Sequence, residues 1–164
     1  MDEMLTQSDW LAFSAILFAG LSALAVIDAR TYRLPDLLTL PLIVIGLIAS
    51  YMLERSLLLS AIGAVIGYGL FFAIEKLYLQ WRGRAGLGRG DAKLLAAGGA
   101  WCGALALAPV VLIASSSALL VVLVYRLSGK SVTRETALPF GPFLSLGISL
   151  VWVLQAVLPD FMML

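Results

Sequence analysis

The sequence contains no histidine and only one cysteine, Cys102. Without histidine, Ser-His and Cys-His catalytic pairs, zinc sites of the HExxH type and histidine proton switches are excluded. One cysteine excludes an internal disulfide and a zinc site built on CxxC pairs, and we interpret Cys102 as a small packing residue. No metal or other cofactor is expected. Any chemistry must come from carboxylates, hydroxyls, lysine, arginine or the backbone.

Charge is scarce as well. The 164 residues include 11 Lys and Arg and 10 Asp and Glu, whereas 62% are hydrophobic and the mean hydropathy is +1.02. An average soluble domain is roughly 45–50% apolar, and a chain of this length has too little interior to hide more. The net charge of +1 predicts no nucleic-acid binding. We expect a membrane protein whose solvent is the lipid bilayer.

Uncharged stretches cover residues 10–27, 37–53, 56–74, 94–125 and 136–159. The fourth would form a helix of roughly 48 Å, too long for a hydrocarbon core of about 30 Å, so we expect a turn at Pro109. The sequence predicts an all-α, polytopic bundle of about six transmembrane helices in a single domain over residues 1–164. The helices are expected at about 10–28, 37–53, 56–80, 92–107, 110–126 and 142–158. The glycine-rich segment 82–90 is expected to be a mobile cytoplasmic loop.

The basic residues predict the orientation in the membrane. Ten of the 11 fall in the first, third and fifth predicted loops: Arg30, Arg33, Lys76, Arg82, Arg84, Arg89, Lys93, Arg126, Lys130 and Arg134. The positive-inside rule places these loops in the cytoplasm and both termini on the outer, periplasmic side. The acidic start of the chain lacks the basic region of a signal peptide, so we expect the first helix to be retained.

Three aspartates lie at the predicted cytoplasmic helix ends. Asp36 is expected to cap the second helix, and Asp91 is either a helix cap or a site residue. Asp28 lies at a helix C-terminus, where the macrodipole disfavours an anion, so it is either paired with Arg30 or Arg33 or part of a site. Two acids remote in sequence but at one membrane face can share a proton, as in an aspartic-protease pair.

Three segments resemble motifs of the bacterial type IV prepilin peptidases. Residues 27–42 read IDARTYRLPDLLTLPL and resemble the DxxxxxxPDxLTLP motif. Residues 86–101 read GLGRGDAKLLAAGGAW and resemble the GxGDxKLLAAxGAW motif. Residues 137–147 read ALPFGPFLSLG and resemble the PFGPFLxxG segment. Three matches in the family's order are far more specific than GxGD alone.

The resemblance implies a GxGD-type aspartyl peptidase of the bacterial cytoplasmic (inner) membrane. Such an enzyme removes the basic leader of type IV prepilins or type II secretion pseudopilins at the cytoplasmic face, beside the pilus or secretion assembly machinery. The catalytic pair maps onto Asp28 and Asp91. Lys93 matches the lysine of GxGDxK, and its own sequence context also allows a snorkelling interfacial anchor.

Further residues of these motifs are expected to bind substrate or support the site: Asp36, Gly88, Gly90, Lys93, Pro139, Phe140, Gly141 and Pro142. The last four are predicted to begin the sixth helix, where proline is welcome. They are also expected to form a backbone wall beside the aspartates, with free carbonyls that pair with an extended substrate strand.

Full-length members of the resembled family carry a preceding cytoplasmic region with cysteine pairs, which is tied to methylation of the new N-terminus. This sequence has nine residues before its first predicted span and one cysteine elsewhere. The expectation is therefore a peptidase without N-methyltransferase activity.

Two other classes of protein stay open at this point. A small proton-coupled transporter would carry acids at mid-depth in the bilayer, whereas the aspartates here lie at one face. A non-catalytic assembly subunit of a pilus or secretion system would use small residues such as Gly63, Gly67, Gly98 and Gly99 for helix packing. Substitution of the aspartates by asparagine would leave such a subunit intact.

Overall fold

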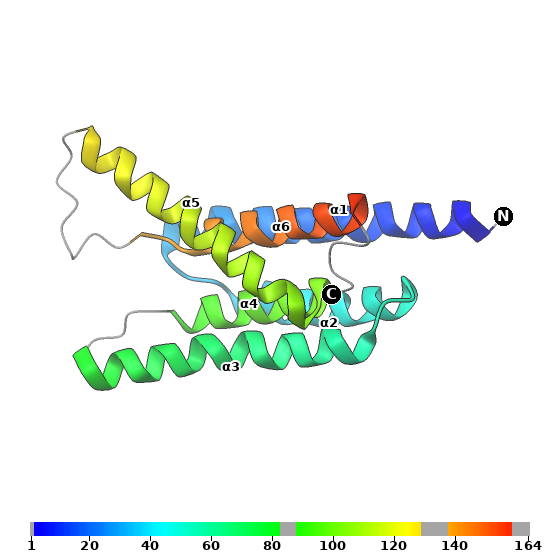
Figure 1. The fold of residues 1–164 in the computed structure, drawn as a ribbon, viewed down its shortest axis with the longest axis horizontal. Coiled ribbons are helices and arrows are strands. Elements are labelled where there is room, and N and C mark those ends of the chain that lie inside the picture. Colours follow the sequence, from blue (N-terminus) through cyan, green and yellow to red (C-terminus); the bar gives the residue numbers. More distant parts are fainter. Residues whose placement is uncertain (1, 83–87, 129–137, 159–164) are drawn as a thin grey trace.

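The computed structural model describes residues 2–82, 88–128 and 138–158, and no strand occurs among them. The helices in chain order are α1 (Asp2–Thr31), α2 (Asp36–Met52), α3 (Leu57–Arg82), α4 (Arg89–Cys102), the 3₁₀ helix η1 (Ala104–Ala106), α5 (Leu107–Leu127) and α6 (Gly141–Val157). They form an elongated bundle in which α1, α3 and α6 follow the long axis and α5 crosses it obliquely (Figure 1). The predicted all-α fold class is confirmed.

Helix α4 lies at the centre of the bundle. It packs against α2, α3 and α6, and every residue from Leu94 to Cys102 is buried. Its 14 residues would span only about 21 Å, well short of the hydrocarbon core. Because its neighbours enclose it, α4 meets protein where an isolated transmembrane helix would meet lipid.

Glycines allow α3 and α4 to approach closely. A Cβ on Gly63 would lie 2.6 Å from the carbonyl oxygen of Gly99, and a Cβ on Gly67 would lie 2.7 Å from that of Leu95. Any side chain at these positions would push the two backbones apart. The expectation that small residues serve helix packing is confirmed at this contact.

The chain turns between α4 and α5 at Gly103, and the predicted turn at Pro109 is wrong. Gly103 has φ of 86°, a conformation that glycine adopts without steric cost. Pro109 is instead the third residue of α5, where the missing N–H would have no intrahelical partner in any case. The predicted helix 92–107 therefore ends at Cys102, and the helix predicted at 110–126 begins at Leu107.

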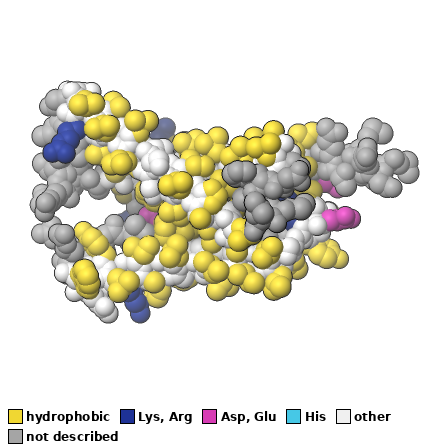
Figure 2. Space-filling model, in the orientation of Figure 1, with side chains coloured by type: hydrophobic (Ala, Val, Ile, Leu, Met, Phe, Trp, Pro, Cys, Tyr) yellow, Lys and Arg dark blue, Asp and Glu magenta, His cyan; other side chains and the backbone are white. Residues whose placement is uncertain are grey.

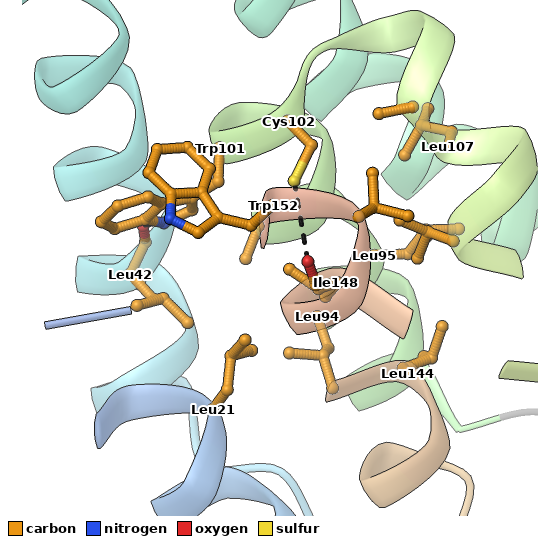
Figure 3. Packing of buried hydrophobic residues seen from close by; sticks show 14 of the residues in the cluster. Leu21, Leu42, Leu94, Leu95, Trp101, Cys102, Leu107, Leu144, Ile148 and Trp152 are labelled. Atoms are coloured by element: carbon orange, nitrogen blue, oxygen red, sulfur yellow. Dashed lines mark hydrogen bonds between the residues drawn. The ribbon is translucent and has the colours of Figure 1, made fainter. Parts of the chain in front are cut away.

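Two tryptophans hold the core together (Figure 3). The Trp101 and Trp152 rings meet edge to face with centroids 5.4 Å apart. Each indole N–H has a partner at 2.8 Å: Trp101 donates to the carbonyl of Leu42, and Trp152 donates to the hydroxyl of Ser14. Cys102 is buried beside them, as the packing interpretation expects. These contacts fix α4 and α6 relative to α1 and α2, and the indole N–H groups of both tryptophans are paired.

The outer surface of the bundle is apolar. Three described segments are long and apolar enough to cross a membrane, namely Ser8–Thr31, Leu57–Trp81 and Ala104–Leu127, and α2 and α6 are shorter apolar helices. Hydrophobic side chains cover the middle of the molecule, with charged side chains towards its ends (Figure 2). Exposed hydrophobic side chains such as these can contact the hydrocarbon core of a bilayer. Much of the predicted loop 82–90 lies outside the described residues, with Arg82 ending α3 and Arg89 beginning α4.

Candidate active site

Asp28 lies in the last turn of α1 and is buried, with 5% of its surface exposed. Its Oδ2 accepts a hydrogen bond of 2.9 Å from the backbone N–H of Gly141, the first residue of α6. That N–H has no partner within its own helix, and the helix N-terminus carries a partial positive charge. The end of α6 therefore supplies the favourable environment that the end of α1 denies to this carboxylate.

The two alternatives for Asp28 can now be separated. Among the described residues, the ion pairs are Lys93 with Asp36 and Arg89 with Glu75. The alternative in which Asp28 forms an ion pair with Arg30 or Arg33 is therefore wrong. Its carboxylate instead accepts the backbone N–H of Gly141 in α6.

Helix α1 ends at Thr31, three residues after Asp28. Tyr32 has φ of 53°, and its N–H donates a hydrogen bond of 2.8 Å to the carbonyl of Asp28. A left-handed residue is a common way to end a helix, although tyrosine is an unusual choice for it. This tight end lets the chain reverse within four residues, from Tyr32 to Pro35, and begin α2 at Asp36.

Asp91 is the third residue of α4 and is partly buried. The backbone N–H of Gly88, the residue before the helix, donates to its carboxylate, as the third residue of a capping box does. Asp91 lies outside the segments that are long and apolar enough to cross a membrane. Burial, followed by the nearby Asp28 carboxylate, raises the pKa of Asp91 to about 6.

Both aspartates line one cavity of about 670 Å³. Its walls come from the end of α1, the turn into α2 and the first turns of α4. These segments are far apart in the sequence, and α6 reaches the same place through the Gly141 contact. The prediction that the two acids share one end of the bundle is consistent with this arrangement.

Asp36 and Lys93 close one side of the cavity. Lys93 Nζ donates to Asp36 Oδ1, which joins the start of α2 to the second turn of α4. Pro35 is the residue that caps α2, and Asp36 is the first helical residue. The predicted capping role of Asp36 is therefore wrong, because its carboxylate pairs with the lysine across the cavity.

Gly90 allows α4 to begin against the α1–α2 turn, and Gly88 lies beside the Asp91 carboxylate. A Cβ on Gly90 would lie 2.8 Å from the Cβ of Leu34, and a Cβ on Gly88 would lie 3.4 Å from Asp91 Oδ2. At Gly90 in particular, any side chain would widen the cavity. Gly90 therefore sets how closely the start of α4, which carries Asp91, approaches the α1–α2 turn.

The segment from Pro139 to Pro142 begins α6, as predicted. Gly141 and Pro142 are the first two helical residues, and the Phe140 ring lies 6.2 Å from that of Phe71. The Phe140 carbonyl already accepts hydrogen bonds of 3.1 Å from Phe143 and Leu144. What faces Asp28 is the Gly141 N–H, so the wall beside the aspartate presents a donor and this carbonyl is not free.

Sequence reasoning missed the pair between Glu75 of α3 and Arg89 of α4. Their Oε1 and Nε lie 3.6 Å apart, and the Glu75 side chain is only 13% exposed. Arg89 also lines the cavity. An acid inside an otherwise apolar helix was the available signal, since Glu75 falls within the predicted helix 56–80. No group of three His, Cys, Asp or Glu side chains that could hold a metal occurs in the part of the chain that the structure describes.

Residues 15–123, most of the chain, match the model of the type IV leader peptidase family. The chain belongs to this family. It is an integral membrane protein, as its long apolar helices and this membership indicate. No solved structure matches the chain.

Curated proteins that are similar in sequence to this chain indicate the same family. The prepilin leader peptidase/N-methyltransferase of Xanthomonas campestris pv. campestris is 41% identical over 84% of this chain and 48% of its own length. The protein of that name from Burkholderia pseudomallei is 46% identical over 80% of this chain and 42% of its own length. The protein of that name from Escherichia coli is 41% identical over 79% of this chain and 57% of its own length. The chain spans about half the length of the curated relatives it matches.

Proposed function

We propose that this member of the type IV leader peptidase family is an aspartyl endopeptidase that removes the leader of type IV prepilins or type II secretion pseudopilins. The observation that carries the proposal is the single cavity lined by Asp28 and Asp91, two carboxylates from helices that are remote in sequence. The relatives are named prepilin leader peptidases, which supports the substrate class.

The surroundings of the two acids support different proton roles. Asp28 accepts the Gly141 N–H at the positive end of α6, a contact that partly offsets the cost of burying its carboxylate. The raised pKa of Asp91 favours the protonated form near neutral pH. In this mechanism Asp28 takes a proton from water as the water oxygen attacks the scissile carbonyl carbon, and Asp91 donates its proton to the carbonyl oxygen. Return of a proton to the amide nitrogen then lets the C–N bond break.

The remaining motif residues hold this pair in place. Gly141 positions Asp28 through its N–H, and the Lys93–Asp36 pair fixes the second turn of α4 against α2. Gly90 keeps the first turn of α4, which carries Asp91, close to the α1–α2 turn. None of these groups needs a metal or cofactor for the hydrolysis as written.

The proposed setting is the bacterial inner membrane, with the whole chain acting as one transmembrane peptidase domain. The distribution of Lys and Arg supports an active site at the cytoplasmic face and termini on the periplasmic side. The proposed partners are the prepilin or pseudopilin, the surrounding lipid and the pilus or secretion machinery that uses the product.

We further propose that this chain cleaves without methylating the product. The turns between α1 and α2 and between α2 and α3 are four residues each, and the sequence has one cysteine, which is buried. These features leave little polar surface with which the described helices could build a nucleotide-like cofactor site.

The assay for the proposed function is leader removal in cells. The chain is co-expressed with a type IV prepilin or a pseudopilin, and the shift of the substrate to its shorter form is followed on a gel. The double variant Asp28→Asn/Asp91→Asn, with its membrane level measured, is the matched control. Processing by the wild-type chain and none by the control is expected. Equal processing by both would show that the aspartates are not catalytic.

The same assay separates the enzyme from the two other classes. A non-catalytic assembly subunit would support pilus assembly equally well with both asparagines in place. A transporter would change proton flux across vesicles and leave the substrate uncut. Glu75, the buried acid of α3, pairs with Arg89 near the same end of the bundle and gives no chain of acids through the membrane.

A further inference from the structure

A second cavity, of about 440 Å³, lies at the end of the bundle opposite Asp28 and Asp91. It is lined by the turn between α2 and α3, the turn between α4 and α5, and the last turn of α6. These elements meet at the end of the molecule where α2 ends and α3 begins (Figure 1). The proposed peptidase mechanism uses no residue of this cavity.

Arg55 is the cation of this cavity, and its side chain is held in place. Its Nη1 donates a hydrogen bond of 3.0 Å to Gln155 Oε1, and its guanidinium carbon lies 4.4 Å from the centre of the Trp152 ring. Gln155 is itself oriented, because its Nε2 donates to the carbonyl of Cys102 at 2.8 Å. Stacking and this hydrogen bond therefore pre-position the guanidinium.

No carboxylate among the described residues neutralises Arg55. The ion pairs in that part of the chain are Lys93 with Asp36 and Arg89 with Glu75. Glu54 precedes Arg55 and lines the same cavity, but it is exposed and forms no ion pair with the guanidinium. Burial accordingly lowers the pKa of Arg55. A partly buried cation that no described carboxylate neutralises is costly near a membrane, and an anion in the cavity would remove that cost.

The remaining donors suit a phosphate group. A guanidinium has five N–H donors in a planar fork that matches phosphate oxygens, and the hydrogen bond to Gln155 uses only one of the nitrogens of Arg55. Ser56 follows it in the cavity wall. Its Oγ accepts the N–H of Leu59 at 3.3 Å, which caps α3 and leaves its own O–H to donate.

The position of the cavity indicates where the phosphate comes from. Arg55 lies between the end of α2 at Met52 and the start of α3 at Leu57, at the level where apolar helices end. Leu59 and Leu105 line the same cavity and are 43% and 56% exposed. A ligand in this cavity would thus meet a cation at one end and lipid-facing leucines at the other.

We propose that this cavity binds the phosphate of an anionic phospholipid, with Arg55 and Ser56 as donors and Leu59 and Leu105 against the acyl chains. The lipid would link the α2–α3 turn to α4 and α6. Basic pockets between transmembrane helices bind lipid headgroups in the same way.

The sharpest variant is Ser56→Asp. Aspartate is as good a helix cap as serine, so α3 keeps its N-terminal cap, while the new carboxylate competes for the Arg55 guanidinium. Arg55→Gln removes the cation directly, although it also loses the stacking on Trp152. Arg126→Gln, at the exposed last turn of α5, is the matched control for loss of one surface arginine.

The measurement is lipid binding to the purified full-length chain in detergent, by native mass spectrometry during titration with phosphatidylglycerol. We expect one lipid per chain to be retained, with affinity reduced at least about tenfold in Ser56→Asp and unchanged in Arg126→Gln. The melting temperature of each variant without lipid shows whether it folds. Because Ser56→Asp retains the cap, it tests binding even if Arg55→Gln fails to fold.

Two competitors identify the chemistry. Diacylglycerol with the same acyl chains lacks the phosphate and should not displace phosphatidylglycerol. Inorganic phosphate at millimolar concentration distinguishes a free anion from a lipid headgroup, and displacement by it alone would overturn the lipid assignment. Equal binding of diacylglycerol, or unchanged binding by Ser56→Asp and Arg55→Gln, would overturn the site itself.

Discussion

The backbone N–H of Gly141 donates a 2.9 Å hydrogen bond to Oδ2 of Asp28 across 113 positions of sequence. The contact is possible because residue 141 is glycine: a Cβ there would lie 2.7 Å from the same oxygen. It joins the last turn of α1 to the first turn of α6. An aspartate disfavoured by its own helix end is thereby stabilised by the N-terminus of another.

Gly141→Ala is expected to lower leader-peptidase activity strongly while the protein still accumulates. The added methyl group must displace the Asp28 carboxylate, and a shift of about 1 Å at a reacting group can cost roughly 100-fold in rate. The measurement is kcat on a purified prepilin in detergent. Gly69→Ala in α3 is the control, because nothing lies within 4 Å of its added Cβ. Similar activities for the two variants would show that the Gly141 contact does not position Asp28.

Asp28→Asn and Asp91→Asn are each expected to abolish detectable leader removal, with a loss of at least about 100-fold, because the proposed mechanism gives each acid its own proton role. Asp36→Asn should cost less than about tenfold. It weakens the pair with Lys93 but leaves both reacting carboxylates in place. Initial rates with equal amounts of membrane-inserted protein give the comparison. Substantial processing by Asp91→Asn would remove Asp91 from the catalytic pair.

The pKa of Asp91 predicts a pH-dependent stability. Because its folded-state value of about 6 lies above the ordinary 3.8, the folded protein binds more protons than the unfolded chain between these values. Stability from this group is therefore present at low pH and lost as the pH rises from about 4 to 6. Asp91→Asn should raise the melting temperature more at pH 7 than at pH 4. An increment that is the same at both pH values would contradict the raised pKa.

Several features of the fold and of the candidate site could be predicted from the sequence. Apolar runs bounded by charge predicted the helices, and the Lys and Arg pattern placed Asp28 and Asp91 at one end of the bundle. The motif resemblance then singled out these two residues as the candidate catalytic pair. Such features are local in the chain or statistical, so they can be read without knowing which helices touch.

What could not be predicted depends on contacts between helices. Asp36 precedes a helix and looks like a cap, but the register of α2 against α4 brings Lys93 to its carboxylate. Pro109 looks like a breaker, yet the positive φ of Gly103 makes the turn. Arg55 looks like an ordinary loop cation until α6 brings Gln155 and Trp152 beside it. In each case tertiary packing decides between local choices of similar energy.

Single cysteines on a Cys102→Ala background test the proposed orientation. A cysteine at Arg33, in the α1–α2 turn, should be shielded from an impermeant thiol reagent in intact cells and labelled after the membrane is opened. A cysteine at Glu54, in the α2–α3 turn, should react from outside. Glu54 is a better reporter than Arg55, which is stacked on Trp152. Labelling of the position 33 cysteine from outside would reverse the orientation and put the aspartate cavity on the wrong face.

Cleavage without methylation is tested by the mass of the product. The purified chain should process a prepilin in the presence of a metal chelator, since the proposed hydrolysis uses two carboxylates and water. With S-adenosylmethionine added, the mature product should keep a free N-terminal amine, because the described helices leave little polar surface for such a cofactor. The E. coli relative, named for both activities, is the positive control under identical conditions. A product heavier by one methyl group would show that this chain also methylates the new N-terminus. Activity lost to the chelator and restored by zinc would show that the hydrolysis requires a metal ion.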